Sequence, residues 1–186
     1  MVSKVNREEA LGSIQANVQD NNTVKHMLAT EAIMRALARK LGEDEEEWGL
    51  TGLLHDIDLE LVEDDPDSHS KLGADIAQDL GASEVMAHAI LCHNEAHGIP
   101  RETKLDKALF CTDPLSGLIT AAALVHPDKL KGLTTTSVMK RFREKRFAAG
   151  VNREQLALCQ EIGLELDEFI TLGIEAMKSI APELEL

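Results

Sequence analysis

Apolar residues recur along most of the chain at the three- and four-residue spacing of an α-helix. The clearest run follows a polar turn at residues 20–23 and consists of Met27, Ile33, Met34, Leu37 and Leu41. Gly42 comes next, and glycine is favoured just past a helix C-terminus. By the same pattern, further helices are predicted over about 6–18, 44–55, 69–80, 83–93, 103–112, 113–126, 153–162 and 166–180. The pattern therefore predicts an all-α fold.

Capping residues mark several of these helix starts. Asn6 and Asn152 each precede a helical run, and their side chains can accept a hydrogen bond from its first turn. Asp113-Pro114 fits an N-cap followed by proline at the first helical position, so we expect one helix to end and another to begin there. No internal repeat, low-complexity segment or Gly/Ser/Pro-rich linker interrupts the chain, which indicates a single domain over residues 1–186.

Composition favours helices over strands and narrows the range of partners. Hydrophobic residues make up 44% and are mostly Leu, Ala and Ile, with 4 Phe, 1 Trp and no Tyr. Asp and Glu number 33 against 19 Lys and Arg, a formal charge of -14. So acidic a surface repels nucleic-acid phosphates and anionic lipid, which argues against binding to duplex nucleic acid or to a membrane.

Two further features bear on location. The polar N-terminus has no apolar signal-peptide core, and no stretch approaches the roughly 18 apolar residues of a membrane span. The cysteines, Cys92, Cys111 and Cys159, include no CxxC spacing and are interpreted as reduced thiols. We therefore expect a cytoplasmic protein.

His55-Asp56 places two polar residues directly after the apolar run that ends in Leu53-Leu54. We expect both side chains to continue this buried helix face, where each unpaired polar group costs about 1–3 kcal/mol. A divalent metal ion would satisfy both. Further ligand-type residues lie near the predicted ends of other helices: His26, His69, His93 and Asp113. Converging helices of a bundle build metal sites from such residues.

The residue types also restrict the metal. Imidazoles with two carboxylates suit Fe, Mn, Zn, Co or Ni and argue against Ca or Mg as the tightly bound ion. We expect one or two ions, with Fe or Mn favoured. Asp56 could bridge two ions with its two oxygens, and a pair about 3.5–4 Å apart would hold a hydroxide for in-line attack on phosphorus. A single histidine would more often be structural, so it is the ordered set that indicates a metal centre.

The order His26, His55-Asp56, Asp113 resembles that of the HD-domain superfamily of metal-dependent phosphohydrolases. Four segments are similar to small bacterial and archaeal members, among them the HD-type diadenosine tetraphosphate hydrolases. They are Leu-Leu-His-Asp-Ile at 53–57, His-Ser-Lys-Leu-Gly-Ala at 69–74, Ala-Ile-Leu-Cys-His at 89–93 and Lys-Ala-Leu-Phe-Cys-Thr-Asp-Pro at 107–114. The resemblance covers about residues 23–124.

This resemblance implies a helical bundle with a metal site at its centre, built from a core of about 23–125 with additional C-terminal helices over about 126–186. It also implies a division of the ligands. His26, His55, Asp56 and Asp113 would hold a first metal ion. His69 and His93, together with Asp56, would hold a second.

Two departures separate the chain from the HD-GYP cyclic-dinucleotide phosphodiesterases. Those enzymes follow the HD pair with Ile-Gly-Lys, whose lysine contacts substrate, whereas residues 57–59 here are Ile-Asp-Leu. Their Gly-Tyr-Pro signature is also absent, and residues 97–100 are His-Gly-Ile-Pro. Cleavage of cyclic di-GMP is therefore disfavoured.

Three residues are candidates for catalysis: Asp56, Asp58 and His97. Asp58 either orients a ligand imidazole or is merely the first charge of an acidic loop. His97 could contact substrate or serve as the leaving-group acid, for which Asp58 and water are the other candidates. His88 lies five positions before His93, about 140° round a helix, and is interpreted as a packing or surface residue.

The basic stretch at residues 140–146 has two interpretations. It is either a solvated helix face or a clamp for the substrate phosphate, formed by Lys140, Arg143 and Lys145. The second interpretation supplies the positive charge that the acidic remainder of the chain lacks.

We expect a metal-dependent phosphohydrolase that acts on a phosphate ester or anhydride of a small nucleotide through a binuclear centre. The alternative enzyme is a mononuclear nucleoside-monophosphate phosphatase that uses the first metal ion alone. A second class of function is a non-catalytic signalling protein that binds a nucleotide or a metal. Such a protein has no obvious need for a complete hydrolytic centre, so the enzyme is favoured.

Overall fold

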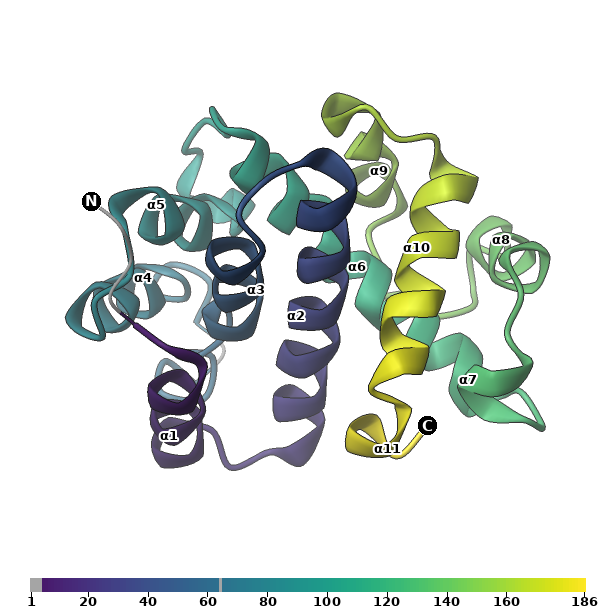
Figure 1. The fold of residues 1–186 in the computed structure, drawn as a ribbon, viewed down its shortest axis with the longest axis horizontal. Helices are drawn as coiled ribbons and strands as arrows, with labels where there is room; N and C mark the ends of the chain where they lie inside the picture. Colours follow the sequence, from purple (N-terminus) through teal and green to yellow (C-terminus); the bar gives the residue numbers. More distant parts are fainter. Residues whose placement is uncertain (1–4, 64) are drawn as a thin grey trace.

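The computed structural model describes residues 5–63 and 65–186 (Figure 1). Within these residues the chain forms helices joined by turns, with no β-strand, so the predicted all-α fold is confirmed. The helices are α1 (Arg7–Asn17), α2 (Asn21–Leu41), α3 (Glu45–Leu54), α4 (Lys71–Asp79), α5 (Glu84–Cys92), α6 (Lys104–Leu124), α7 (Lys129–Gly132), α8 (Thr135–Arg143), α9 (Arg153–Ala157), α10 (Leu166–Ser179) and α11 (Ala181–Leu184). Two 3₁₀ helices are η1 (Glu95–His97) and η2 (Leu158–Ile162).

Helix α2 lies at the middle of the fold. It packs between α3 and α10 and also contacts α6 (Figure 1). Met27 and Ile33 on its apolar face are fully buried, as the pattern predicts. Helix α3 approaches α2 closely because Gly52 has no side chain: a Cβ there would lie 3.0 Å from the carbonyl oxygen of Thr30. This close approach brings the end of α3 next to the start of α2.

Helix α6 runs without a break from Lys104 to Leu124, so the expected boundary at Asp113-Pro114 is wrong. Pro114 has no N–H to donate to the carbonyl of Phe110 one turn earlier. The side-chain amide of Gln155 donates to that carbonyl instead, with 2.7 Å between Nε2 and O. Asp113 therefore lies in the middle of a long helix rather than at the start of one.

Helices α4 and α5 pack against each other, and α5 also contacts α3 (Figure 1). Helix α5 begins where predicted, with the Ser83 hydroxyl accepting from the backbone N–H of Met86. Helix α4 begins two residues later than predicted, at Lys71, because Ser70 takes the left-handed conformation at φ 70°. His69 therefore precedes α4 instead of starting it.

The C-terminal helices extend the bundle on the other side of α2. Helix α10 packs across α2 and α6, and α8 lies beyond α10, at the opposite end of the molecule from α4 and α5 (Figure 1). Helix α11 returns to contact α2. Because α8 ends at Arg143, Lys145 lies outside the helix and does not continue its faces.

No helix in the described part of the chain is both long and apolar enough to cross a membrane.

Candidate metal centre

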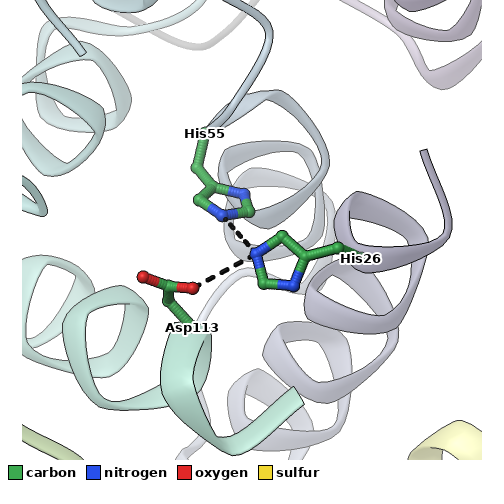
Figure 2. Close-up of side chains that lie close together, drawn as sticks. All are labelled: His26, His55 and Asp113. Atoms are coloured by element: carbon green, nitrogen blue, oxygen red, sulfur yellow. Dashed lines mark hydrogen bonds and ion pairs between the residues drawn. The ribbon is translucent and has the colours of Figure 1, made fainter. Parts of the chain in front are cut away.

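The six predicted ligand residues come together inside the bundle, where α2, α6 and the ends of α3 and α5 meet: His26, His55, Asp56, His69, His93 and Asp113. Figure 2 shows the His26 ring between His55 and Asp113. The Nε2 atom of His26 lies 3.1 Å from Nε2 of His55 and 3.1 Å from Oδ1 of Asp113. These three atoms are close enough to bind one metal ion together.

The two oxygens of Asp56 face different histidines. Oδ2 lies 3.4 Å from Nε2 of His26 and 3.3 Å from Nε2 of His55. Oδ1 lies 3.4 Å from Nε2 of both His69 and His93. The carboxylate therefore contacts two pairs of histidines at once, one pair with each oxygen. His55, Asp56 and His93 also lie close enough together to bind one metal ion.

His55 and His93 are oriented by the ends of the helices that carry them. His55 Nδ1 donates to the carbonyl of Gly52 at 2.8 Å, and His93 Nδ1 donates to the carbonyl of Ile90 at 2.5 Å. The last carbonyls of a helix have no partner within it, so they are free to accept these bonds. A proton held at Nδ1 leaves the Nε2 lone pair for a metal ion.

His26 is oriented from α6. Its Nδ1 atom lies 2.8 Å from the hydroxyl oxygen of Ser116, and that hydroxyl donates to the backbone carbonyl of Asp113 at 3.0 Å. The helix that supplies the Asp113 carboxylate thus also fixes the His26 ring. The sequence carries no sign of this role, because a serine within an apolar helical run has no ligand pattern of its own.

Asp58 holds His69 from the side away from the centre. The carboxylate is fully buried; Oδ1 accepts from His69 Nδ1 at 2.9 Å, and Oδ2 accepts from the backbone N–H groups of Ser70 and Gly73 at 2.7 and 2.8 Å. A Cβ on Gly73 would lie 3.1 Å from this carboxylate, so glycine allows α4 to come close. This geometry is that of a carboxylate that orients a ligand imidazole, rather than of a charge in a solvated loop.

The charges of the cluster are balanced against one another. Burial lowers the pKa of His26, but hydrogen bonds to Asp113 and Asp56 outweigh it and raise the pKa from 6.5 to about 10. Burial would raise the pKa of Asp56, yet the neighbouring His55 and His26 hold that pKa well below its usual range. His26 likewise lowers the pKa of Asp113 against the effect of burial. The site therefore favours a positive charge between its carboxylates, which either a proton or a metal ion supplies.

The remaining predicted site residues lie outside this cluster. His97 is in η1, where its Nε2 donates to the backbone carbonyl of His69 at 2.7 Å and so braces the loop before α4. Lys140 and Arg143 line a separate pocket between α8 and the start of α10, and Lys145 follows α8. In the described structure these three basic residues are not brought to the cluster, and their role as phosphate ligands stays a prediction.

A cavity of about 420 Å³ adjoins the cluster at His26, the one predicted ligand among the residues that line it. The His26 and Asp113 side chains are 25% and 32% exposed, whereas that of His55 is fully buried. His26 and Lys25 line the cavity, and residues 184–186 contribute to its wall. The Lys25 ammonium forms an ion pair with Glu185. The sequence gives no sign of a role for Lys25 beyond its position next to His26.

Comparison with known families identifies the class of protein. The HD domain model matches residues 23–124, more than half of the chain. The chain therefore belongs to the HD-domain family, as its motifs indicate, and so to a superfamily of metal-dependent phosphohydrolases. HD domains bind divalent metal ions, and the imidazoles and carboxylates gathered here are a donor set that fits such ions.

The chain is also similar to parts of several proteins named Ribonuclease Y. The protein from Oleidesulfovibrio alaskensis is 33% identical over 96 residues, covering 52% of this chain and 18% of the relative. That from Lawsonia intracellularis is 33% identical over 103 residues, covering 55% and 20%. That from Sulfurovum sp. is 25% identical over 169 residues, covering 88% and 33%. The chain thus spans a third or less of the length of these relatives. No solved structure matches it.

Proposed function

We propose that this chain hydrolyses a phosphate ester or anhydride of a small nucleotide at a binuclear metal centre. The supporting observation is that the two carboxylate oxygens of Asp56 face separate pairs of imidazoles. Two divalent ions would supply Lewis acidity towards the phosphoryl oxygens and a hydroxide near neutral pH. His26, His55 and Asp113 would hold one ion, His69 and His93 would hold the other, and both would share Asp56.

Neighbouring residues hold the protons of two imidazoles on nitrogen atoms that face away from this centre. Asp58 keeps a proton on Nδ1 of His69, and both of its oxygens already accept hydrogen bonds. We therefore assign Asp58 a positioning role rather than that of leaving-group acid. The Nε2 proton of His97 is directed to the His69 carbonyl, so His97 also acts on the position of that loop. In this proposal the leaving group takes its proton from solvent.

The substrate would occupy the cavity beside His26. Its volume of about 420 Å³ falls within the range of small-molecule sites. Lys25 provides a cation for a phosphate group, and Leu124 and Leu184 provide apolar surface for a base. Because Lys25 is paired with Glu185 in the free protein, a bound phosphate would take the place of that carboxylate.

A second candidate is hydrolysis of RNA, favoured by the name shared by the matched relatives, Ribonuclease Y. The formal charge of -14 counts against it, since binding a long phosphate backbone depends on basic residues that neutralise it. A nucleotide is therefore the first choice and RNA the second.

The test is a hydrolysis screen of Mn²⁺-loaded protein. The substrates are nucleoside monophosphates, a dinucleoside polyphosphate and a labelled single-stranded RNA, with the Asp56→Asn variant as the inactive control. Phosphate or nucleotide release that requires Asp56 supports the proposal, and faster RNA cleavage supports the second candidate. Activity that survives intact in His69→Ala favours a mononuclear phosphatase. Turnover of none of these substrates overturns the hydrolase proposal.

A further inference from the structure

A second cluster of metal-ligand residues lies between α5 and the start of α6, outside the six-residue centre. His88 and Cys92 are four residues apart on α5 and so share one face of that helix. Asp106, in the first turn of α6, lies against them. One donor atom from each of these three residues lies within 4.8 Å of the others.

The Asp106 carboxylate is only partly satisfied by the protein. It is fully buried, and Oδ2 accepts from the backbone N–H groups of Glu102 and Thr103 at 2.9 and 2.8 Å and lies 3.1 Å from His88 Nδ1. The other oxygen, Oδ1, has no hydrogen-bond partner. Leaving a buried charged oxygen without a partner is costly, so this atom indicates that a further positive ligand completes the site.

We propose that His88, Cys92 and Asp106 bind a second kind of metal ion, of the zinc type. An imidazole, a thiolate and a carboxylate are the donors that Zn²⁺ combines, at bonds of about 2.0–2.3 Å. The thiolate distinguishes this site from the main centre, whose donors are nitrogen and oxygen only, because sulfur ligands favour Zn²⁺ over Mn²⁺. Water would complete the coordination of such an ion, and the His88 side chain, which is 33% exposed, connects the site with solvent.

A nucleophilic role for the same residues is excluded by burial. Cysteine, histidine and aspartate are also the residue types of a Cys–His–Asp nucleophilic arrangement. Cys92 is fully buried, however, so no substrate carbon or phosphorus could reach its sulfur. A metal ion needs no such access once it is bound.

The position of the site gives it a structural effect on the main centre. Cys92 is the last residue of α5 and directly precedes His93, whose Nε2 faces Asp56. An ion that joins Cys92 to Asp106 would pin the end of α5 to the start of α6. The ion would thereby hold His93 in place without belonging to the main centre.

The experiment uses Co²⁺ added to the metal-free, full-length protein. Only a cysteine ligand gives the near-ultraviolet thiolate-to-cobalt charge-transfer absorption, so the band reports this site and not a centre of imidazoles and carboxylates. We expect the band in the wild type and its loss in Cys92→Ser, with bound cobalt reduced by one ion per chain. The matched controls are Cys111→Ser and Cys159→Ser, which remove the other two buried thiols and should keep the band.

Further variants separate this site from the main centre. The band should disappear in His88→Ala and Asp106→Asn and persist in His55→Ala, with circular dichroism to confirm folding of each. Absence of the band in folded wild-type protein overturns the proposal. Loss of the band in His55→Ala but not in His88→Ala also overturns it, because the thiolate would then serve the main centre. These outcomes do not depend on whether the protein hydrolyses any nucleotide.

Discussion

Replacing Asp58 by Asn should weaken one of two metal ions without unfolding the protein. The backbone N–H groups of Ser70 and Gly73 require an acceptor, so the amide oxygen would face them and the amide NH₂ would face His69. Nδ1 of His69 would then have to accept a hydrogen bond, which moves the ring proton to Nε2. That nitrogen is the one directed at Asp56 Oδ1, so the proton blocks ligation there.

The expected size of the effect follows from the role of such partners. Loss of the group that orients a ligand imidazole typically costs about 10–100-fold in metal affinity. This corresponds to about 1.4–2.8 kcal/mol, since each factor of ten is about 1.4 kcal/mol. Asp58→Ala should be more damaging to the fold, because two buried backbone donors lose their acceptor at about 1–3 kcal/mol each.

Calorimetric titration of metal-free protein with Mn²⁺ measures this directly. The wild type should bind two ions, and Asp58→Asn should bind one with unchanged affinity and the other 10–100-fold more weakly, as estimated above. The matched control is Asp67→Asn, which removes the same charge from an exposed position in the same loop. Equal affinity for both ions in Asp58→Asn and the wild type would refute the assignment of Asp58.

Three further predictions address the cavity, the protonation of the centre and the fold. Lys25→Met should raise KM about tenfold or more with little change in kcat, since a charge-assisted bond contributes about 1.5–3 kcal/mol. Lys40→Met, which alters a lysine paired with Glu168, should leave KM unchanged. Equal KM values for both variants would contradict the substrate site. Metal binding at neutral pH should release protons, because the raised pKa keeps His26 in the metal-free site protonated up to about pH 10. The affinity for metal should therefore rise with pH. The stability that this proton gives the metal-free fold is present below about pH 6.5 and is lost towards pH 10. Calorimetry in two buffers of different ionisation enthalpy counts these protons, and a count of zero would contradict the raised pKa. Gln155→Leu should destabilise the protein by about 1–3 kcal/mol in urea unfolding, because the buried carbonyl of Phe110 loses its donor, and unchanged stability would show that the carbonyl finds another partner.

The grouping of the six candidate ligands was predictable from sequence because each of them lies in a recognisable local pattern. His55 and Asp56 stand out as polar residues after an apolar run, and the order of the other imidazoles and Asp113 resembles that of a known family. The helical pattern likewise placed most helices, since apolar periodicity reports which face is buried.

What the sequence did not reveal depends on contacts between distant residues. Pro114 reads as a helix start, and only the amide of Gln155, far along the chain, allows α6 to continue through it. The orienting role of Ser116 and the pairing of Lys25 with Glu185 arise in the same way. The phosphate clamp at residues 140–146 was inferred from charge and stays a prediction. In the fold, α10 lies between α8 and α2, which carries His26 (Figure 1).

The most direct test of the central claim is elemental analysis of protein purified without added metal or chelator, beside His55→Ala and His69→Ala. A binuclear centre predicts at least two transition-metal ions per chain, with fewer in both variants. One ion, lost only in His55→Ala, would contradict the binuclear centre and leave a mononuclear one. No metal in any sample, even after reconstitution with Mn²⁺ or Fe²⁺, would contradict the metal centre altogether.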